Sequence, residues 1–300
     1  MLYPSTIKMS SITPDTINLF ARQGSSKANN DAENKLREEC LVYLASGRNL
    51  DERWTSIGEK FHISMSRVCP GYSRMELIQK GGRTFNYDFD AIFYDDVDAI
   101  VQTSHIEFKH NASRIDKIPQ FLSLQDKFVL IGATSYSAFY YTNYLDTHLS
   151  EIAYVGDKPT YEQYERLVSS LDWKCHPMFE KMRAAEEQSE HKKQVRVLVR
   201  KSISDYLELY AHTIDIARLT AKFKSTQTDK IFLLWDLNNF HVETLNDLEM
   251  SNLTFDRVKN NNTIVVASSN YEYHLLLRWR NHLGILNPAW QISIHPRKIL

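Results

Sequence analysis

The chain has 300 residues, and its 36 lysines and arginines against 37 aspartates and glutamates give a formal net charge of −1. This balance excludes a uniformly basic nucleic-acid binder but leaves room for a local basic groove. The hydrophobic content suffices for one large or two modest cores, and three well-separated cysteines favour neither a disulfide framework nor a Cys-type zinc site. With no secretory signal pattern and no apolar run of membrane-spanning length, we expect a soluble intracellular protein, cytoplasmic or nuclear.

Residues 1–30 are expected to form an N-terminal arm and linker, and a helix is predicted to follow. Apolar residues recur at helical spacing from Ala32 to Leu44, and Asn30 or Asp31 can cap the first turn. Gly47 is expected to end this helix. Beyond it, we expect residues 61–79 to be extended.

A β-hairpin is predicted between residues 85 and 111, with an aspartate-rich turn at 95–98. Its apolar strands carry unexpected charge. Asp90 leads into an apolar run, and Glu107 and Lys109 stand on either side of an apolar residue. Period-two geometry places Glu107 and Lys109 on one face of their strand, and Asp90 can join them from the partner strand.

Charge inside strand-forming sequence needs a chemical reason, because an unpaired charge in low dielectric is costly. Two carboxylates suit Mg²⁺, with Mn²⁺ as a substitute, and a nearby lysine can position or polarise an attacking water. The alternative is an exposed ion pair that adds little stability. We favour the functional interpretation because an acidic residue, a turn and a Glu-x-Lys strand occur together. The flanking His105 and His110 are expected to be ordinary strand-end residues.

After the hairpin, Arg114 and Lys117 lie in a short basic loop, where they are either phosphate contacts or solvated charges. Pro119 would break a helix interior but suits its first position, so a helix is predicted to begin there. Gln120 would then lie in the first turn, near the Glu-x-Lys strand. It is either a functional amide or an ordinary one on the helix surface.

Residues 134–226 are expected to form a helical insertion rich in aromatic residues. We expect the tyrosines near its start to be core and not a base-stacking platform. Lys193, Arg196 and Arg200 follow one another at helical spacing and form a stripe that is a candidate nucleic-acid contact. The alternative, which we favour, is a solvated helix face.

Residues 227–300 are expected to return to α/β alternation and to complete the sheet begun by the hairpin, although two tandem domains are the alternative. Strands are predicted at 230–235, 263–267 and 290–294, and a helix at 271–283. Asp236 follows the first of these strands, in what we expect to be an Asx-rich turn.

The pattern of Asp90 followed by Glu107-Phe108-Lys109 resembles the PD-(D/E)xK nuclease superfamily, although Phe89 stands where that motif has proline. The resemblance covers residues 30–130. It implies an α/β, restriction-endonuclease-like mixed β-sheet flanked by helices, here with a helical insertion. Residues 31–133 would be the first part of the nuclease core.

The resemblance also implies further site residues. Glu33 lies on the apolar face of the first helix, where the superfamily's helix glutamate would sit. Glu39 is the competing candidate, and Glu38 is expected to face water. Many members carry a Gln-x-x-x-Tyr element after Glu-x-Lys, but position 124 is Leu, so Gln120 lacks the tyrosine.

The leading hypothesis is a Mg²⁺-dependent nuclease acting on DNA rather than RNA. Asp90, Glu107 and Glu33 would hold the metal, Lys109 would assist the water, and Gln120 would orient a water or touch a phosphate. The alternative is a catalytically inactive nuclease-fold protein that binds nucleic acid or another protein. No Gly-rich phosphate loop, Ser-His-Asp order or His-Glu-x-x-His signature supports a nucleotide hydrolase or metalloprotease.

Overall fold

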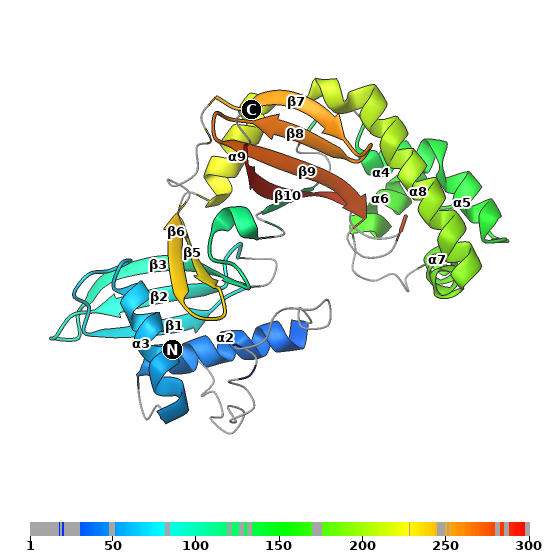
Figure 1. Cartoon of the computed structure of the whole chain (residues 1–300). Coiled ribbons are helices and arrows are strands. Elements are labelled where there is room, and N and C mark those ends of the chain that lie inside the picture. The colour runs from blue at the N-terminus through cyan, green and yellow to red at the C-terminus, as the bar shows by residue number, and fades with distance from the viewer. Residues whose placement is uncertain are drawn as a thin grey trace. The chain divides into compact units, whose positions relative to one another are not determined.

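The computed structural model describes residues 18, 20, 31–47, 52–81, 85–118, 120, 122–125, 129–130, 134–169, 176–227, 229–244, 250, 252–279, 283–284 and 288–297. The chain divides into two compact units, each built around a five-stranded sheet (Figure 1). Unit 1 comprises Met1–Ile118 and Lys224–Leu248, and unit 2 comprises Pro119–Phe223 and Glu249–Leu300. The mixed α/β class is therefore confirmed. Among the described residues, no helix has the length and apolar character needed to cross a membrane.

The sheet of unit 1 has the order β1-β2-β3-β5-β6, with strands Arg74–Gln79, Phe89–Tyr94, Ile100–His110, Lys230–Trp235 and Phe240–Thr244. The first three strands pair antiparallel, so the predicted hairpin is confirmed. In its turn, Asp95 Oδ1 accepts hydrogen bonds from the backbone N–H groups of Val97 and Ala99. β5 then pairs parallel with β3, and β6 pairs antiparallel with β5. The Glu-x-Lys strand therefore lies in the middle of the sheet.

Two helices of unit 1, α2 (Asp31–Ser46) and α3 (Glu52–Met65), pack on one face of this sheet (Figure 1). Gly47, at φ +57°, follows α2 as expected, because glycine adopts the left-handed conformation without a steric penalty. The prediction that the chain is extended from residue 61 is wrong for residues 61–65, which belong to α3. In α3, the buried residues Trp54, Phe61 and Met65 recur at near-helical intervals, and this spacing favours a helix with one apolar face.

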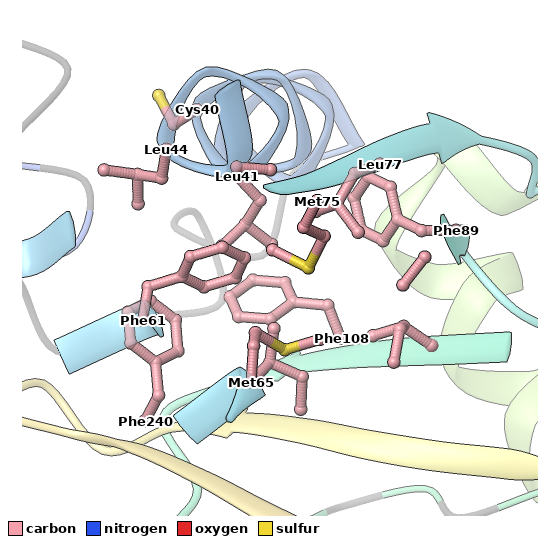
Figure 2. Packing of buried hydrophobic residues seen from close by; sticks show 14 of the residues in the cluster. Cys40, Leu41, Leu44, Phe61, Met65, Met75, Leu77, Phe89, Phe108 and Phe240 are labelled. Carbon is pink, nitrogen blue, oxygen red and sulfur yellow. The ribbon is translucent and has the colours of Figure 1, made fainter. Parts of the chain in front are cut away.

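The core of unit 1 lies between these helices and the sheet (Figure 2). Its side chains come from both helices and from all five strands of the sheet. The residues labelled in the figure are Cys40, Leu41, Leu44, Phe61, Met65, Met75, Leu77, Phe89, Phe108 and Phe240. Because side chains alternate along a strand, Glu107 and Lys109 lie on the sheet face opposite to Phe108. Cys40 and Cys69 are buried, whereas Cys175 lies outside the described residues.

Unit 2 contains an antiparallel sheet of order β4-β10-β9-β8-β7, with strands β4 Leu122–Gln125, β7 Thr254–Lys259, β8 Thr263–Ala267, β9 Tyr271–Trp279 and β10 Pro288–Pro296. Two predictions are wrong here. The segment after Gln120 forms β4 instead of a helix, and residues 271–279 form β9. Tyr273, Leu275, Leu277 and Trp279 are buried at every second position, and this alternation fits a strand between β8 and β10.

The helices of unit 2 are α4 Tyr136–Asn143, α5 Leu145–Glu151, α6 Tyr161–Ser169, α7 Pro177–Glu187 and α8 Ser189–Tyr210, and α9 Ile216–Gln227 runs across the boundary into unit 1. The aromatic residues of α4 are core, as predicted. Tyr136 and Tyr140 are fully buried, and their rings contact Trp279 at centroid distances of 5.6 and 5.3 Å. These contacts tie the helical region to the second sheet.

The expected domain division therefore needs a correction. Of residues 227–300, only β5 and β6 complete the sheet begun by the hairpin, whereas β7–β10 build a second sheet with β4. The helices between 134 and 223 belong to the unit of that second sheet and do not form a separate insertion. Short turns join β7 to β8 and β8 to β9, so these strands pair with their chain neighbours. Of the expected arm at 1–30, the structure describes only residues 18 and 20.

The helix–sheet core predicts a clear contrast between two neighbouring residues of α3. Phe61 is fully buried and Ile63 is 62% exposed. Phe61→Ala should destabilise unit 1 by about 3–5 kcal/mol, because it leaves a cavity in the core. Ile63→Ala should change stability by no more than about 0.5 kcal/mol. Hydrogen exchange of the β3 amides measures both effects, and equal protection in the two variants would contradict this packing.

Candidate functional site

A buried carboxylate, Glu107, is held between two lysines on the face of the sheet away from α2 and α3. Lys109 Nζ lies 2.5 Å from Glu107 Oε1, and Lys230 Nζ lies 2.6 Å from Oε2. Lys109 is two residues further along β3, while Lys230 begins the neighbouring parallel strand β5. Burial acts to raise the pKa of Glu107, but the two lysine charges outweigh it and the pKa is lowered. Glu107 is therefore ionised at neutral pH.

A second carboxylate, Asp88, lies against the same segment of β3. Its backbone N–H donates to the carbonyl of Ile106 at 2.8 Å, and its Oδ2 accepts from the backbone N–H of Phe108 at 2.8 Å. This bond holds the carboxylate beside the peptide that joins Glu107 to Phe108. Burial and the charge of Glu107 raise the pKa of Asp88, although Lys109 acts in the opposite direction.

The third carboxyl group belongs to Glu38 of α2, which lies beside the edge strand β1. Its Oε2 accepts a hydrogen bond of 3.3 Å from Gln79 Nε2, at the end of β1. Burial and then the charge of Asp88 raise the pKa of Glu38 to about 7, against the opposing charge of Lys109. Near neutral pH, this carboxyl group therefore changes its protonation state.

Lys109 interacts electrostatically with all three carboxyl groups. Burial acts to lower its pKa, but the charges of Glu107 and Asp88 outweigh burial and raise it. Lys109 therefore remains a cation at neutral pH, and it can place a positive charge but cannot accept a proton. We call Glu38, Asp88, Glu107, Lys109 and Lys230 the carboxylate–lysine cluster.

The structure brings Glu107 and Lys109 together as predicted, but it places Asp90 in a different set of contacts. Asp90 Oδ2 lies 3.0 Å from Lys80 Nζ, and Oδ1 lies 2.9 Å from His105 Nδ1. Burial acts to raise the pKa of Asp90, but these contacts outweigh it and lower the pKa. Asp88 thus occupies the position that we assigned to Asp90.

Sequence periodicity could not choose between these aspartates. Asp88 and Asp90 are two residues apart, so alternation directs both to the same face of an extended segment. The pairing register decides, because it places Asp90 opposite His105 and so brings Asp88, and not Asp90, beside Glu107.

The helix glutamate was also misassigned. Glu33 Oε2 lies 3.7 Å from Nη2 of the fully buried Arg37, one turn along α2. Glu38, expected to face water, instead contributes to the cluster, because α2 lies along β1 and the edge strand covers its flank. Glu39, the competing candidate, makes no hydrogen bond or ion pair with the cluster among those recorded for the described residues, but its charge contributes to the raised pKa of Glu38.

The remaining candidates lie outside the cluster. Gln120 is exposed, in neither a helix nor a strand, and belongs to unit 2. Arg114 forms an ion pair of 3.0 Å with Asp116, and Lys117 is exposed. The α8 residues of the basic stripe are also exposed: Lys193, Arg196 and Arg200. Their contacts with nucleic acid remain predictions.

Lys230 was missed, although the sequence carried a signal for it. It is a charge at the start of an apolar strand, which is the feature that drew attention to Asp90. Its partner Glu107 lies 123 residues earlier in the chain, so only the parallel pairing of β3 with β5 reveals their contact.

Within the described part of the chain, no group of three or more His, Cys, Asp and Glu side chains is arranged to hold a metal ion. The chemistry of the carboxylate–lysine cluster nevertheless fits a divalent cation. Carboxylate oxygens are the ligands that Mg²⁺ takes in proteins. Burial is the main cause that raises the pKa values of Asp88 and Glu38, and a bound cation would favour the ionised forms of both groups.

The raised pKa of Glu38 predicts a pH-dependent stability of unit 1. A carboxyl pKa of about 7 in the folded state, against 4.5 as the reference, means that the folded state binds the extra proton between these values. Stability from this group is present below pH 4.5 and is lost as the pH rises through 7. Glu38→Gln should therefore stabilise unit 1 at pH 8 and have little effect at pH 4.5.

Carboxyl ¹³C NMR and hydrogen exchange measure this titration and the stability difference. The Glu38 resonance should titrate near pH 7. A titration near 4.5, or a variant whose advantage grows as the pH falls, would contradict the assignment.

Comparison with known proteins does not assign this chain to a family. No protein-family model matches it, and no curated protein matches its sequence. The resemblance to the PD-(D/E)xK nucleases therefore stays a prediction from the sequence.

Proposed function

We propose that this protein is a metal-dependent nuclease that hydrolyses phosphodiester bonds in nucleic acid, most simply DNA. The hydrogen bond from the Phe108 N–H to the Asp88 carboxylate carries this proposal. It holds Asp88 beside Glu107 and Lys109, the three residue types that the PD-(D/E)xK pattern requires. Asp88 is preceded by Tyr87 and not by the proline of the motif, just as Asp90 is preceded by Phe89.

Asp88 and Glu107 would hold Mg²⁺, which Mn²⁺ can replace. When bound, the ion polarises a phosphoryl oxygen and increases the acidity of a water. Lys109 keeps its proton and stabilises the negative charge that develops on the phosphate. Lys230 holds the second oxygen of Glu107 and so fixes the orientation of this carboxylate.

Glu38 is the proton acceptor in this proposal. A general base works best when its pKa lies near the operating pH, and burial with the charge of Asp88 brings the pKa of Glu38 to about 7. Glu38 in its ionised form takes the proton from the attacking water. The positive charge of Lys109 then stabilises the negative charge that develops on the phosphate.

A second candidate function is supported by the contacts of Glu107. Both of its oxygens are engaged by lysines, which favours a nuclease-fold protein that binds nucleic acid without cleaving it. Such a protein would keep its affinity when the carboxylates are replaced, and the affinity would fall steeply with salt. Product formation separates the two functions.

The nuclease proposal predicts loss of cleavage in three single variants of the cluster. Asp88→Asn, Glu107→Gln and Lys109→Ala should each lower the cleavage rate of labelled DNA by about 100-fold or more, because each removes a charge from the reacting centre. Cleavage should also require added Mg²⁺ or Mn²⁺ and stop with a chelator. Gel analysis of single- and double-stranded substrates measures these rates.

Glu76→Gln on β1 is the matched control. Glu76 belongs to the same sheet but accepts a hydrogen bond from Tyr94, away from the cluster, so this variant should cleave normally. Asp90→Asn should lower cleavage less than Asp88→Asn does. Full activity in all three cluster variants, or no product with any divalent metal, would sink the nuclease proposal. In the second case, retained binding would support the non-cleaving function.

A further inference from the structure

We propose that Lys80, Phe85, Tyr87 and His105 form a stacking platform for an unpaired nucleobase of the substrate. This inference rests on the proposed function in that it takes a nucleic acid as the ligand. It adds the substrate class, a single-stranded or locally unpaired strand. We refer to these four residues as the aromatic platform.

The platform is a continuous row of rings that runs from the residues before β2 to the middle of β3. The Tyr87 and His105 rings are stacked, with centroids 4.2 Å apart and an interplanar angle of 20°. Phe85 continues the row at 5.5 Å from Tyr87. Both outer members are open to solvent, since Phe85 is 38% exposed and the His105 side chain is 39% exposed. An exposed end of such a row offers a π-face to a base.

Asp90 organises this platform, which accounts for its contacts outside the carboxylate–lysine cluster. Its carboxylate binds Lys80 Nζ at 3.0 Å and His105 Nδ1 at 2.9 Å. Lys80 Nζ in turn lies 5.1 Å from the centroid of the Phe85 ring. Asp90 therefore holds both the His105 ring and the Lys80 ammonium group of the platform.

The charge beside the rings identifies a nucleotide as the occupant. Any of the nucleobases can stack on an aromatic side chain, and a lysine beside that side chain can pair with the phosphate of the same nucleotide. An apolar peptide would use the rings but would gain nothing from Lys80. At the opposite end of β2, Tyr94 and Arg74 form a separate pair, with the guanidinium 3.6 Å from the ring centroid and bound to Asp98.

The platform lies next to the proposed reacting centre along the chain. Tyr87 directly precedes Asp88, and His105 lies two residues before Glu107 on the same strand face. At a rise of roughly 3.3 Å per residue, the His105 and Glu107 positions are about 7 Å apart. A base that stacks on the platform would thus bring a neighbouring phosphate to the cluster.

The experiment measures binding of a fluorescent single-stranded oligonucleotide by anisotropy, with a chelator present so that no cleavage occurs. Phe85→Ala should weaken binding by roughly 5- to 100-fold, which corresponds to the loss of one stacked base. Phe255→Ala is the matched control. Phe255 is 41% exposed on β7 of unit 2, so its removal tests for non-specific binding to an exposed aromatic side chain and should leave the affinity unchanged.

A second series localises the stacked base. Single abasic sites are placed at each position of the oligonucleotide, and the wild-type protein should lose affinity at one position. Phe85→Ala should lose nothing further at that same position, because base and ring form one interaction. Tyr87→Leu, checked for unchanged hydrogen exchange of β3, should behave like Phe85→Ala.

Four results would each overturn the platform. In the variants, these are wild-type affinity in Phe85→Ala, or equal losses of affinity in Phe85→Ala and Phe255→Ala. In the wild-type protein, they are equal affinity for all abasic positions, or no binding of single strands. Because binding is measured without metal, its outcome is separate from that of the nuclease proposal. A localised abasic effect without any cleavage keeps the platform and removes the nuclease. Cleavage with a flat abasic series does the opposite.

Discussion

The ionised Glu107 carboxylate, bound by a lysine from each of two parallel strands, is the interaction on which this account depends. A buried carboxylate stays charged only when nearby cations and hydrogen bonds offset its desolvation. Lys109 supplies one cation from β3 and Lys230 supplies the other from β5, across 123 residues of sequence. The pair of lysines therefore links the pairing of β3 with β5 to the charge state of the site. Removal of either lysine would leave a buried charge with half its compensation.

The alternation of β3 separates the core of unit 1 from this chemistry. Ile106 and Phe108 pack against the helices, while Glu107 and Lys109 lie on the opposite face. The backbone of the core residue Phe108 also donates the hydrogen bond that holds Asp88. The apolar core thus positions two of the three carboxyl groups, and α2 positions the third.

Local patterns in the sequence were enough for part of the fold. The hairpin followed from two apolar runs around an aspartate-rich turn, and α2 followed from helical spacing and Gly47. The segment at 271–279 was misread as a helix because a run of three leucines fits either structure. Its partners β8 and β10 settle that choice, and their pairing is not local information.

The site was predictable to the same extent. Glu107 and Lys109 followed from their spacing, but Asp88 depended on the pairing register of β2 with β3, and Glu38 on how far β1 covers the flank of α2. Lys230 depended on a pairing between distant strands. Each of these three residues was fixed by tertiary contacts, which a single sequence does not reveal.

Calorimetric titration with Mg²⁺ at pH 7 tests the central claim most directly. A cation held by Asp88 and Glu107 would favour the ionised forms of the neighbouring carboxyl groups, so binding should release protons. Repeating the titration in buffers of different ionisation enthalpy measures that release, which should fall in Glu38→Gln. We expect the wild-type protein to bind the ion and Asp88→Asn to lose this binding. Unchanged Mg²⁺ affinity in Asp88→Asn, or no binding by the wild-type protein, would contradict the account.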